Sequence, residues 1–229
     1  MSQSKSSRRW LAEHHQDPFV RRARAEGWRS RAVFKLAEIL GRDRLLRPGM
    51  RVIDLGAAPG GWSQYVARTL GGRGRIIALD RLPMDPIPGV EFVHGDFNDP
   101  EAICKVEHLL GGERADLVLS DMAPNMIGVT QVDQVRAMAL AEEALEAALR
   151  WLKPGGHFVV KLFHGPGFDA YVKRLKTEFT KVAVRKPKAS RSRSAETYAV
   201  AQALRAARAG SHSGTIKVEE VDPSSERER

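Results

Sequence analysis

Two lysines and two acids in this chain have the side chains needed for proton transfer. Lys161 lies within the apolar run 158–163, Phe-Val-Val-Lys-Leu-Phe. Lysine is rarely buried without a partner. Lys161 therefore either extends into solvent at the strand end or has a catalytic role in a buried site. A lysine that is desolvated and close to other cations can serve as a general base. We expect Asp121, at the end of a neighbouring strand, to meet Lys161.

Glu196 and Lys35 are weaker candidates when each is read alone. Glu196 is the only acid between residues 181 and 208, where eight lysines and arginines lie, and it opens a predicted strand. Lys35, on the first predicted helix of the core, reads as an ordinary solvated lysine. The seven histidines lack metal-ligand spacing and the chain has one cysteine, so we predict no metal site. Cys104, beside Ile103 and Val106, is predicted to be a small buried hydrophobe.

A glycine-rich turn follows the predicted strand 51–55. The sequence Asp54-Leu-Gly56-Ala-Ala-Pro59-Gly60-Gly61 differs from the dinucleotide fingerprint Gly-x-Gly-x-x-Gly. Pro59 has no N–H to offer a phosphate, and the glycines leave room for a bulky ligand. This favours S-adenosylmethionine, an adenosyl cofactor without phosphates. Another mononucleotide, or a plain tight turn, remains an alternative.

Acidic residues recur where the predicted strands end. Asp54, Asp80, Asp96 and Asp121 close or follow four successive strands, and ligands of α/β sheets bind at these carboxyl ends. Each alone could be a helix cap or a turn residue. Together they favour a binding edge, at which we assign Asp80 to the cofactor's ribose and Asp96 to its adenine amine.

The elements that must position these residues alternate along the chain. This alternation predicts a single α/β domain with a mostly parallel, seven-stranded sheet covered on both faces and closed by an antiparallel strand. Ser30 is expected to cap the first helix, and the run 153–156 to stop the long one. Helices are expected at 31–40, 61–70, 99–110, 132–152 and 168–179, and strands at 51–55, 75–79, 91–93, 116–120, 157–163, 182–184 and 197–201.

Positive charge is concentrated in two flanks. The net charge of the 229-residue chain is +9; residues 1–31 hold eight lysines and arginines against three acids, and residues 181–208 hold eight against one. The planar guanidinium of arginine binds phosphate well. The flanks therefore favour binding of RNA or DNA over a charged surface that only keeps the protein soluble. We divide the chain into a basic RNA-facing arm (1–30), the catalytic domain (31–208) and a disordered polar tail (209–229). No apolar run has membrane-spanning length, and we expect a cytoplasmic protein.

From about Arg8 to Ala203 the chain resembles, in collinear order, the FtsJ/RrmJ family of RNA ribose 2′-O-methyltransferases, and within it the bacterial enzymes of large-subunit ribosomal RNA. The resemblance implies a Rossmann-like fold and a Lys-Asp-Lys-Glu tetrad, Lys35, Asp121, Lys161 and Glu196 (hereafter the tetrad). It also implies binding of S-adenosylmethionine by Gly56, Gly60, Trp62, Asp80, Asp96 and Asp121. The segments that carry it are 30–36, 54–64, 82–86, 95–97, 120–125, 158–161, 185–187, 190–191 and 196–198.

The resulting expectation is 2′-O-methylation of a uridine ribose in 23S rRNA, with Lys161 as base, Asp121 and Glu196 orienting its amine, and Lys35 holding the ribose or phosphate. The expected partner is the 50S subunit and the expected state a monomer. One alternative is a tRNA ribose methyltransferase of the same family. A base N-methyltransferase, from the faint motif 121–125, and a non-catalytic RNA-binding assembly protein are less favoured.

Overall fold

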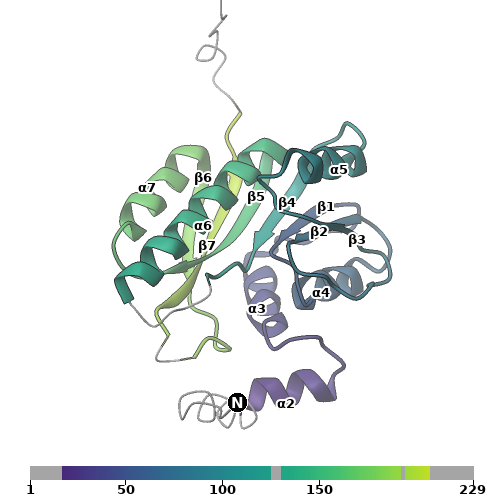
Figure 1. Cartoon of the computed structure of the whole chain (residues 1–229), viewed down its shortest axis with the longest axis horizontal. Helices are drawn as coiled ribbons and strands as arrows, with labels where there is room; N and C mark the ends of the chain where they lie inside the picture. Colours follow the sequence, from purple (N-terminus) through teal and green to yellow (C-terminus); the bar gives the residue numbers. More distant parts are fainter. Residues whose placement is uncertain (1–16, 125–129, 192–193, 207–229) are drawn as a thin grey trace, which may run out of the picture.

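The computed structural model describes residues 17–124, 130–191 and 194–206 (Figure 1). Within them lies a seven-stranded sheet of order β3-β2-β1-β4-β5-β7-β6. The first five strands in this order are parallel, and β7 runs antiparallel to both β5 and β6. The fold class is therefore confirmed. The strands are β1 (Arg51–Leu55), β2 (Arg75–Asp80), β3 (Glu91–His94), β4 (Ala115–Ser120), β5 (Leu152–Phe163), β6 (Phe179–Arg185) and β7 (Glu196–Leu204).

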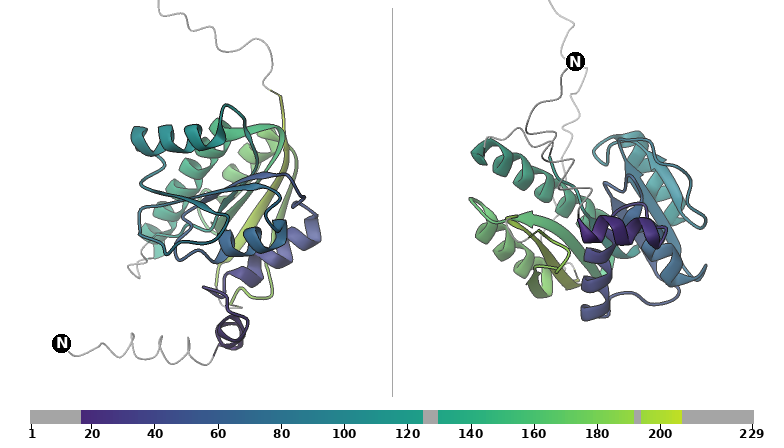
Figure 2. Two further views of the ribbon diagram at one scale, coloured as in Figure 1. Left: turned by 90° about the vertical axis from the view of Figure 1, so that its right-hand side faces the viewer. Right: turned by 90° about the horizontal axis from the view of Figure 1, so that it is seen from below.

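Helices cover both faces of the sheet (Figure 2). One hydrophobic cluster joins α5, α6 and α7 to one face, and a second joins α3 and α4 to the other. Because both faces are covered, the central strands are apolar on both sides. The helices are α2 (Pro18–Ala25), α3 (Val33–Asp43), α4 (Gly61–Leu70), α5 (Pro100–Leu110), α6 (Thr130–Trp151) and α7 (Phe168–Glu178).

The sheet order places the predicted site at one edge. Strand order reverses between β1 and β4, and in open α/β sheets ligands bind at such a switch point, beyond the carboxyl ends of the strands. The antiparallel β7 begins at this same edge, with Glu196 paired to Phe163 at the end of β5. The first residue of β7 is thereby brought beside the last residues of the parallel strands.

Three local expectations are wrong. Helix α2 was not predicted, although Asp17 caps it and Pro18 starts it. Ser30 does not cap α3, which begins at Val33 with no side-chain cap. The long helix α6 ends at Trp151, before the run 153–156 as expected, but β5 starts at Leu152 instead of residue 157, and Leu152 pairs with Ala115 next to a register shift.

One side chain that was predicted to be buried lies at the surface, and an apolar side chain of α6 is exposed as well. Cys104 is exposed, because Ala102, Val106 and Leu110 form the face of α5 that packs on the sheet and residue 104 points away from it. Val135 of α6 is 68% exposed. No helix in the described part of the chain has the length and apolarity needed to cross a membrane. The predicted tail, most of the basic arm and Asn125 lie outside the described residues.

Candidate active site

Strand periodicity directs the charged side chains of β5 and β7 toward α3. Lys161 and Tyr198 are cross-strand partners, and Glu196 lies two residues before Tyr198 on the same face of β7. Tyr198 packs in the cluster formed by α3 and α4. Lys35 is one of the buried residues of α3 and contacts the same face. The four tetrad residues therefore meet between the sheet and α3, although Lys35 and Glu196 are separated by 161 positions.

Lys161 is held by Asp121 at the carboxyl edge of β4 and β5. Its Nζ donates to the backbone carbonyl of Asp121 at 2.9 Å and lies 2.8 Å from Oδ1 of the same residue. Glu196 Oε2 is 3.8 Å from this Nζ. The Lys161 side chain is only 9% exposed. The predicted meeting of Lys161 with Asp121 is confirmed, and the ammonium is buried among acids instead of extending into solvent.

Glu196 is the centre of the cluster. Lys35 Nζ lies 2.7 Å from Oε1 and donates to Oε2 at 2.9 Å. Ser190 Oγ donates to Oε1 at 2.7 Å, and Lys35 also donates to the Tyr198 hydroxyl at 3.3 Å. Lys35 is thus a buried ion-pair partner, and reading it as a solvated surface lysine would have been wrong. Its expected contact with ribose or phosphate stays a prediction.

The two lysines determine the ionisation of Glu196. Burial by itself would raise the pKa of the Glu196 carboxyl, but the charges of Lys35 and Lys161, with hydrogen bonds from Lys35 and Ser190, outweigh it and lower the pKa. The carboxylate is therefore ionised at neutral pH. Burial, reinforced by the nearby Asp121 and Glu196 charges, raises the pKa of Tyr198 well above its usual value. Its neutral hydroxyl donates to Asp121 Oδ1 at 2.7 Å.

The glycine-rich turn lies beside this cluster, at the carboxyl ends of β1 and β2. Gly56 and Gly60 have φ of +70° and +101°, which favour glycine. A Cβ at Gly56 would lie 2.3 Å from Met122 Cγ, so this side chain packs directly on bare backbone. Gly60 precedes α4, whose first turn contains Trp62. The turn is therefore shaped by close approaches that other residues would block.

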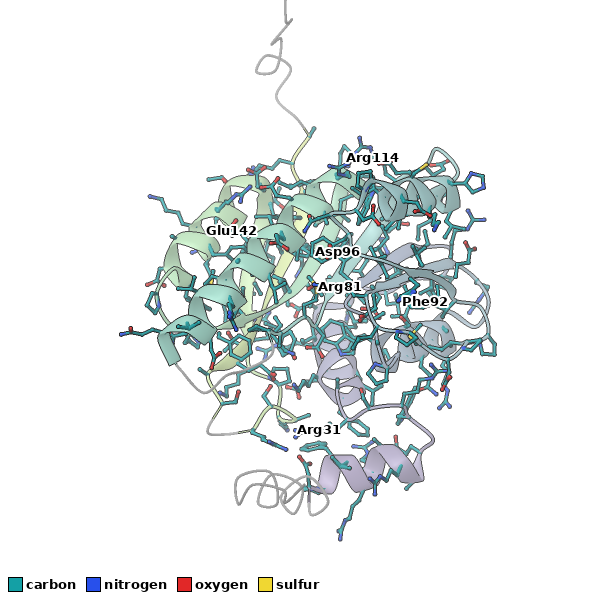
Figure 3. All side chains as sticks on the ribbon, in the orientation of Figure 1. Arg31, Arg81, Phe92, Asp96, Arg114 and Glu142 are labelled. Carbon is teal, nitrogen blue, oxygen red and sulfur yellow. The ribbon has the colours of Figure 1, made fainter. Side chains whose placement is uncertain are left out.

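The acids at the strand ends have different local partners. Asp80 ends β2 and its two oxygens accept from the backbone N–H groups of Ala58 at 2.8 Å and Leu82 at 2.7 Å. Asp96 accepts from Asn98 N at 2.9 Å and lies 3.6 Å from the guanidinium of Arg81, and Figure 3 shows these two side chains close together. Together with Asp121 they form one row at the ends of β3, β2 and β4. Their roles toward a cofactor stay predictions.

Trp62 is placed differently from the other predicted cofactor residues. Its ring is 3% exposed and lies 5.8 Å from the Tyr198 ring, centroid to centroid. Its Nε1 donates to the carbonyl of Ala32 at 2.9 Å. The side chain therefore packs α4 against α3 and Tyr198, which leaves its backbone at the start of α4 as the part that could face a ligand.

Asp54 is buried inside β1 instead of ending it. Ser63 Oγ donates to its Oδ2 at 2.6 Å, while Oδ1 is buried without a hydrogen bond to any described residue. Burial is the main cause that raises the pKa of Asp54 to about 7, with the charges of Asp121 and Asp80 adding to it and the Ser63 hydrogen bond opposing it. This buried acceptor without a donor lies next to the turn.

We expect Asp54→Asn to remove a pH dependence of stability in the ligand-free protein. An aspartate in the unfolded chain ionises at about 3.9, whereas Asp54 in the folded protein ionises at about 7. Between these values the folded state holds the extra proton, so unfolding free energy falls as pH rises, by at most about 1.4 kcal/mol per unit. Urea unfolding from pH 5 to 8 measures this slope. The exposed Asp85→Asn is the control, and equal slopes in wild type and Asp54→Asn would contradict the assignment.

Three residues that sequence reasoning missed support the site. Tyr198 and Ser190 bind tetrad oxygens, and Arg31, labelled in Figure 3, donates to the carbonyl of Ala189 and to the Asp17 carboxylate. Arg31 thus ties α2 to the loop that carries Ser190. Tyr198 could have been found from the two-residue period of β7 after Glu196. Ser190 and Arg31 carry no comparable signal, because Ser190 lies in a loop outside any strand period and Arg31 reaches Ala189 across 158 positions.

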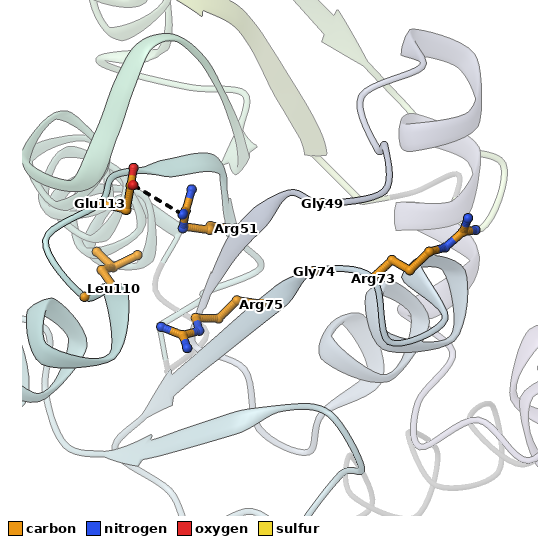
Figure 4. Close-up of a pocket in the computed structure, with 8 residues that line it drawn as sticks. Gly49, Arg51, Arg73, Gly74, Arg75, Leu110 and Glu113 are labelled. Atoms are coloured by element: carbon orange, nitrogen blue, oxygen red, sulfur yellow. Dashed lines mark ion pairs between the residues drawn. The ribbon is translucent and has the colours of Figure 1, made fainter.

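A cavity of about 450 Å³ lies elsewhere, at the amino edge of the sheet (Figure 4). Arg51 and Arg75, the first residues of β1 and β2, line it together with Glu113, which lies 3.7 Å from Arg51. Because the tetrad and the strand-end acids lie at the opposite edge, this cavity is separate from the candidate active site.

Comparisons with known proteins agree with this geometry. A sequence model of FtsJ-like methyltransferases matches residues 28–204. Two relatives described as ribosomal RNA large subunit methyltransferase E, from Stenotrophomonas maltophilia strain K279a and Xanthomonas campestris pv. campestris strain B100, are each 58% identical over 205 residues, covering 90% of this chain and 98% of theirs.

A solved structure has the same fold. The crystal structure of a Plasmodium falciparum protein, described as a ribosomal RNA methyltransferase, aligns with a TM-score of 0.71 at 29% identity. The alignment covers 77% of this chain and 98% of that chain. The family match includes all four residues of the buried tetrad and the whole glycine-rich turn. This chain belongs to the family of FtsJ-like methyltransferases.

Proposed function

We propose that this methyltransferase transfers a methyl group from S-adenosylmethionine to the 2′-hydroxyl of a uridine ribose in 23S ribosomal RNA, with Lys161 as general base. The observation that carries the proposal is the Lys161 amine, buried between Asp121 and Glu196 beside the glycine-rich turn. A ribose hydroxyl is a poor nucleophile and needs a base as its oxygen attacks. The relatives named for large-subunit ribosomal RNA support the substrate.

The turn and the strand-end acids fit an adenosyl cofactor. At Gly56 and Gly60 other side chains approach the backbone more closely than a Cβ would allow, and Asp54 Oδ1 is a buried acceptor without a hydrogen bond to the described residues. Asp80 and Asp96 would hold the ribose and the adenine amine, and Asp121 would border both cofactor and tetrad. Bound S-adenosylmethionine would supply an electrophilic methyl group on a sulfonium.

Lys161 is positioned to act as a base when neutral. A neutral lysine amine keeps two N–H donors and one lone pair. The two donors match two acceptors of Asp121, the carbonyl at 2.9 Å and Oδ1 at 2.8 Å. The lone pair is then free to accept the proton of the 2′-hydroxyl. Glu196, held by Lys35 and Ser190, stabilises the ammonium that forms.

The basic surface near the tetrad would bind RNA phosphates. Arg21, Arg22 and Arg24 of α2 are exposed, as are Lys186 and Lys188 in the loop before β7. Arg31 links α2 to this loop. Phosphate contacts orient an RNA without reading its sequence, so they do not select the target nucleotide. We propose that the protein acts as a cytoplasmic monomer on the 50S subunit.

The test is transfer of labelled methyl from S-adenosylmethionine to intact 50S subunits, free large-subunit rRNA and bulk tRNA, with Lys161→Ala as control. The proposal predicts label on ribosomal RNA at one linkage that resists alkaline cleavage, and no label with Lys161→Ala. Label on tRNA alone would overturn the substrate. If digestion to nucleosides showed the methyl group on a base, the proposed 2′-O chemistry would be wrong.

A further inference from the structure

The guanidinium of Arg29 joins two backbone segments at the edge of the glycine-rich turn. Its Nη1 donates to the carbonyls of Pro59 at 3.1 Å and Asp85 at 2.7 Å. Its Nη2 donates to the carbonyl of Pro86 at 2.7 Å. Pro59 belongs to the turn, whereas Asp85 and Pro86 belong to the segment 81–90 between β2 and β3. One side chain thus connects two segments that are adjacent at the carboxyl ends of β1 and β2.

Apart from those of Arg29 and the packing of Ile87, few described hydrogen bonds hold the middle of the segment 81–90. It contains no helix or strand, and its prolines at 83, 86 and 88 have no N–H to donate. The other hydrogen bonds hold its ends: Asp80 accepts from Leu82 N, His94 Nε2 contacts the carbonyl of Arg81, and Val90 N donates to Ile87 O. At Asp85 and Pro86, the described carbonyl contacts come from Arg29.

This segment covers the turn directly. A Cβ placed on Gly60 would lie 2.7 Å from Ile87 Cδ1, 2.8 Å from Met84 Sδ and 3.1 Å from Arg29 Nη1. The side chains of the segment therefore pack on the bare backbone of Gly60. Any ligand lying against the turn between β1 and β2 is bordered by this segment, and the shape of its binding site depends on where the segment is held.

Arg29 is itself anchored to α4. Its backbone N–H donates to Gln64 Oε1 at 3.0 Å, and Gln64 Nε2 donates to the carbonyl of Gly27 at 2.9 Å. The guanidinium of Arg68 lies 4.2 Å from the centroid of the Trp28 ring. The base of the arginine is thus fixed on the helix that the turn begins, so its guanidinium reaches the segment 81–90 from a rigid support.

We infer that Arg29 is a positioning residue for the cofactor site, which fastens the segment 81–90 against the glycine-rich turn and so maintains affinity for the adenosyl ligand. The inference rests on the proposed function in that the ligand is S-adenosylmethionine. Arg29 acts through the backbone of Pro59, Asp85 and Pro86. Its loss would loosen the wall of the site while leaving the tetrad intact.

The test is calorimetric titration of the full chain with S-adenosylhomocysteine. Arg29→Ala is expected to bind about tenfold more weakly than wild type, since charge-assisted hydrogen bonds to three carbonyls are lost. Arg29→Lys should remain weakened, because an ammonium cannot bridge the three carbonyls as the planar fork does. Arg42→Ala, which removes an exposed charge on α3, is the matched control and should bind like wild type. In Arg29→Ala, the KM for S-adenosylmethionine should rise, whereas kcat at saturating S-adenosylmethionine should stay nearly unchanged.

Hydrogen exchange separates this inference from the proposed function. The amides of Leu82, Met84, Asp85 and Ile87 should exchange faster in Arg29→Ala than in wild type or Arg42→Ala. If the Kd of S-adenosylhomocysteine for Arg29→Ala were within twofold of the wild-type Kd, the inference would be overturned. If wild type itself bound no S-adenosylhomocysteine, the proposed function would fail. The exchange rates would then decide whether Arg29 holds the segment.

Discussion

Lys161→Arg is expected to lower kcat by about a thousandfold, within the range that general acid–base catalysis contributes. Arginine keeps the positive charge near Asp121 and Glu196 but cannot give up its proton, so it cannot accept one from a ribose hydroxyl. Affinity for S-adenosylhomocysteine should change little, because the turn and Asp80 are untouched. Single-turnover methyl transfer to the ribosomal substrate measures the chemical step directly.

Two further variants keep this prediction decisive. Lys161→Met, which keeps length without charge, should be equally inactive, so that crowding by arginine in the buried site is not the cause. Lys181→Arg, at an exposed lysine of β6, is the matched control and should retain full activity. Turnover of Lys161→Arg within tenfold of wild type would show that Lys161 is not the base.

Glu196→Gln is expected to lower both activity and stability. The carboxylate lies between two buried ammonium groups, 2.7 Å from Lys35 Nζ and 3.8 Å from Lys161 Nζ. Removing one partner of a buried ion pair leaves charge uncompensated, so we expect a loss of about 3 kcal/mol in the free energy of unfolding at pH 7. The variant also lacks the charge that stabilises the Lys161 ammonium formed in the reaction, so its kcat should be at least about a hundredfold lower than that of wild type.

The stability effect should depend on pH in a defined direction. Because the pKa of Glu196 is lowered in the folded protein, its stabilising contribution is present above the unfolded value of about 4.3 and is lost as pH falls through the folded value. Urea unfolding at pH 7, 5 and 3.5 should therefore show the difference between wild type and Glu196→Gln narrowing at low pH. Ser190→Ala, which removes only one hydrogen bond to Glu196, should cost about 1 kcal/mol. A pH-independent difference for Glu196→Gln would refute the role of its charge.

The half of the site that we propose for the cofactor was largely predictable, because each of its residues ends or closely follows a predicted strand. The turn after β1 follows an apolar strand and precedes a helix, so Gly56 and Gly60 were placed by local pattern alone. The strand-end positions of Asp80, Asp96 and Asp121 follow from the alternation of elements and from the geometry of a parallel sheet. Asp54 was predicted to lie with these acids at the strand ends. Strand periodicity instead turns its side chain into the interior, where Ser63 donates a hydrogen bond to it.

The tetrad could not be assembled from local pattern. Lys161 was identified as unusual because it interrupts an apolar run, but Lys35 looks like any solvated lysine in its own helix. Its assignment came from family resemblance, and the contact with Glu196 across 161 positions explains it. The exposure of Cys104 and the start of β5 at Leu152 were missed because they depend on which helix face is covered and which strand is paired.

The sequence by itself determined the fold class, the glycine-rich turn and the row of acids, because hydrophobic periodicity and backbone restrictions act over a few residues. Tertiary structure alone decided that Lys35, Glu196, Tyr198 and Ser190 share one buried network, and that Arg29 bridges the turn and the segment 81–90. Such contacts depend on strand order, register and the docking of α3, which are set by packing of the whole domain. The pKa shifts of Glu196 and Tyr198 follow from burial and from these contacts, and no local pattern encodes them.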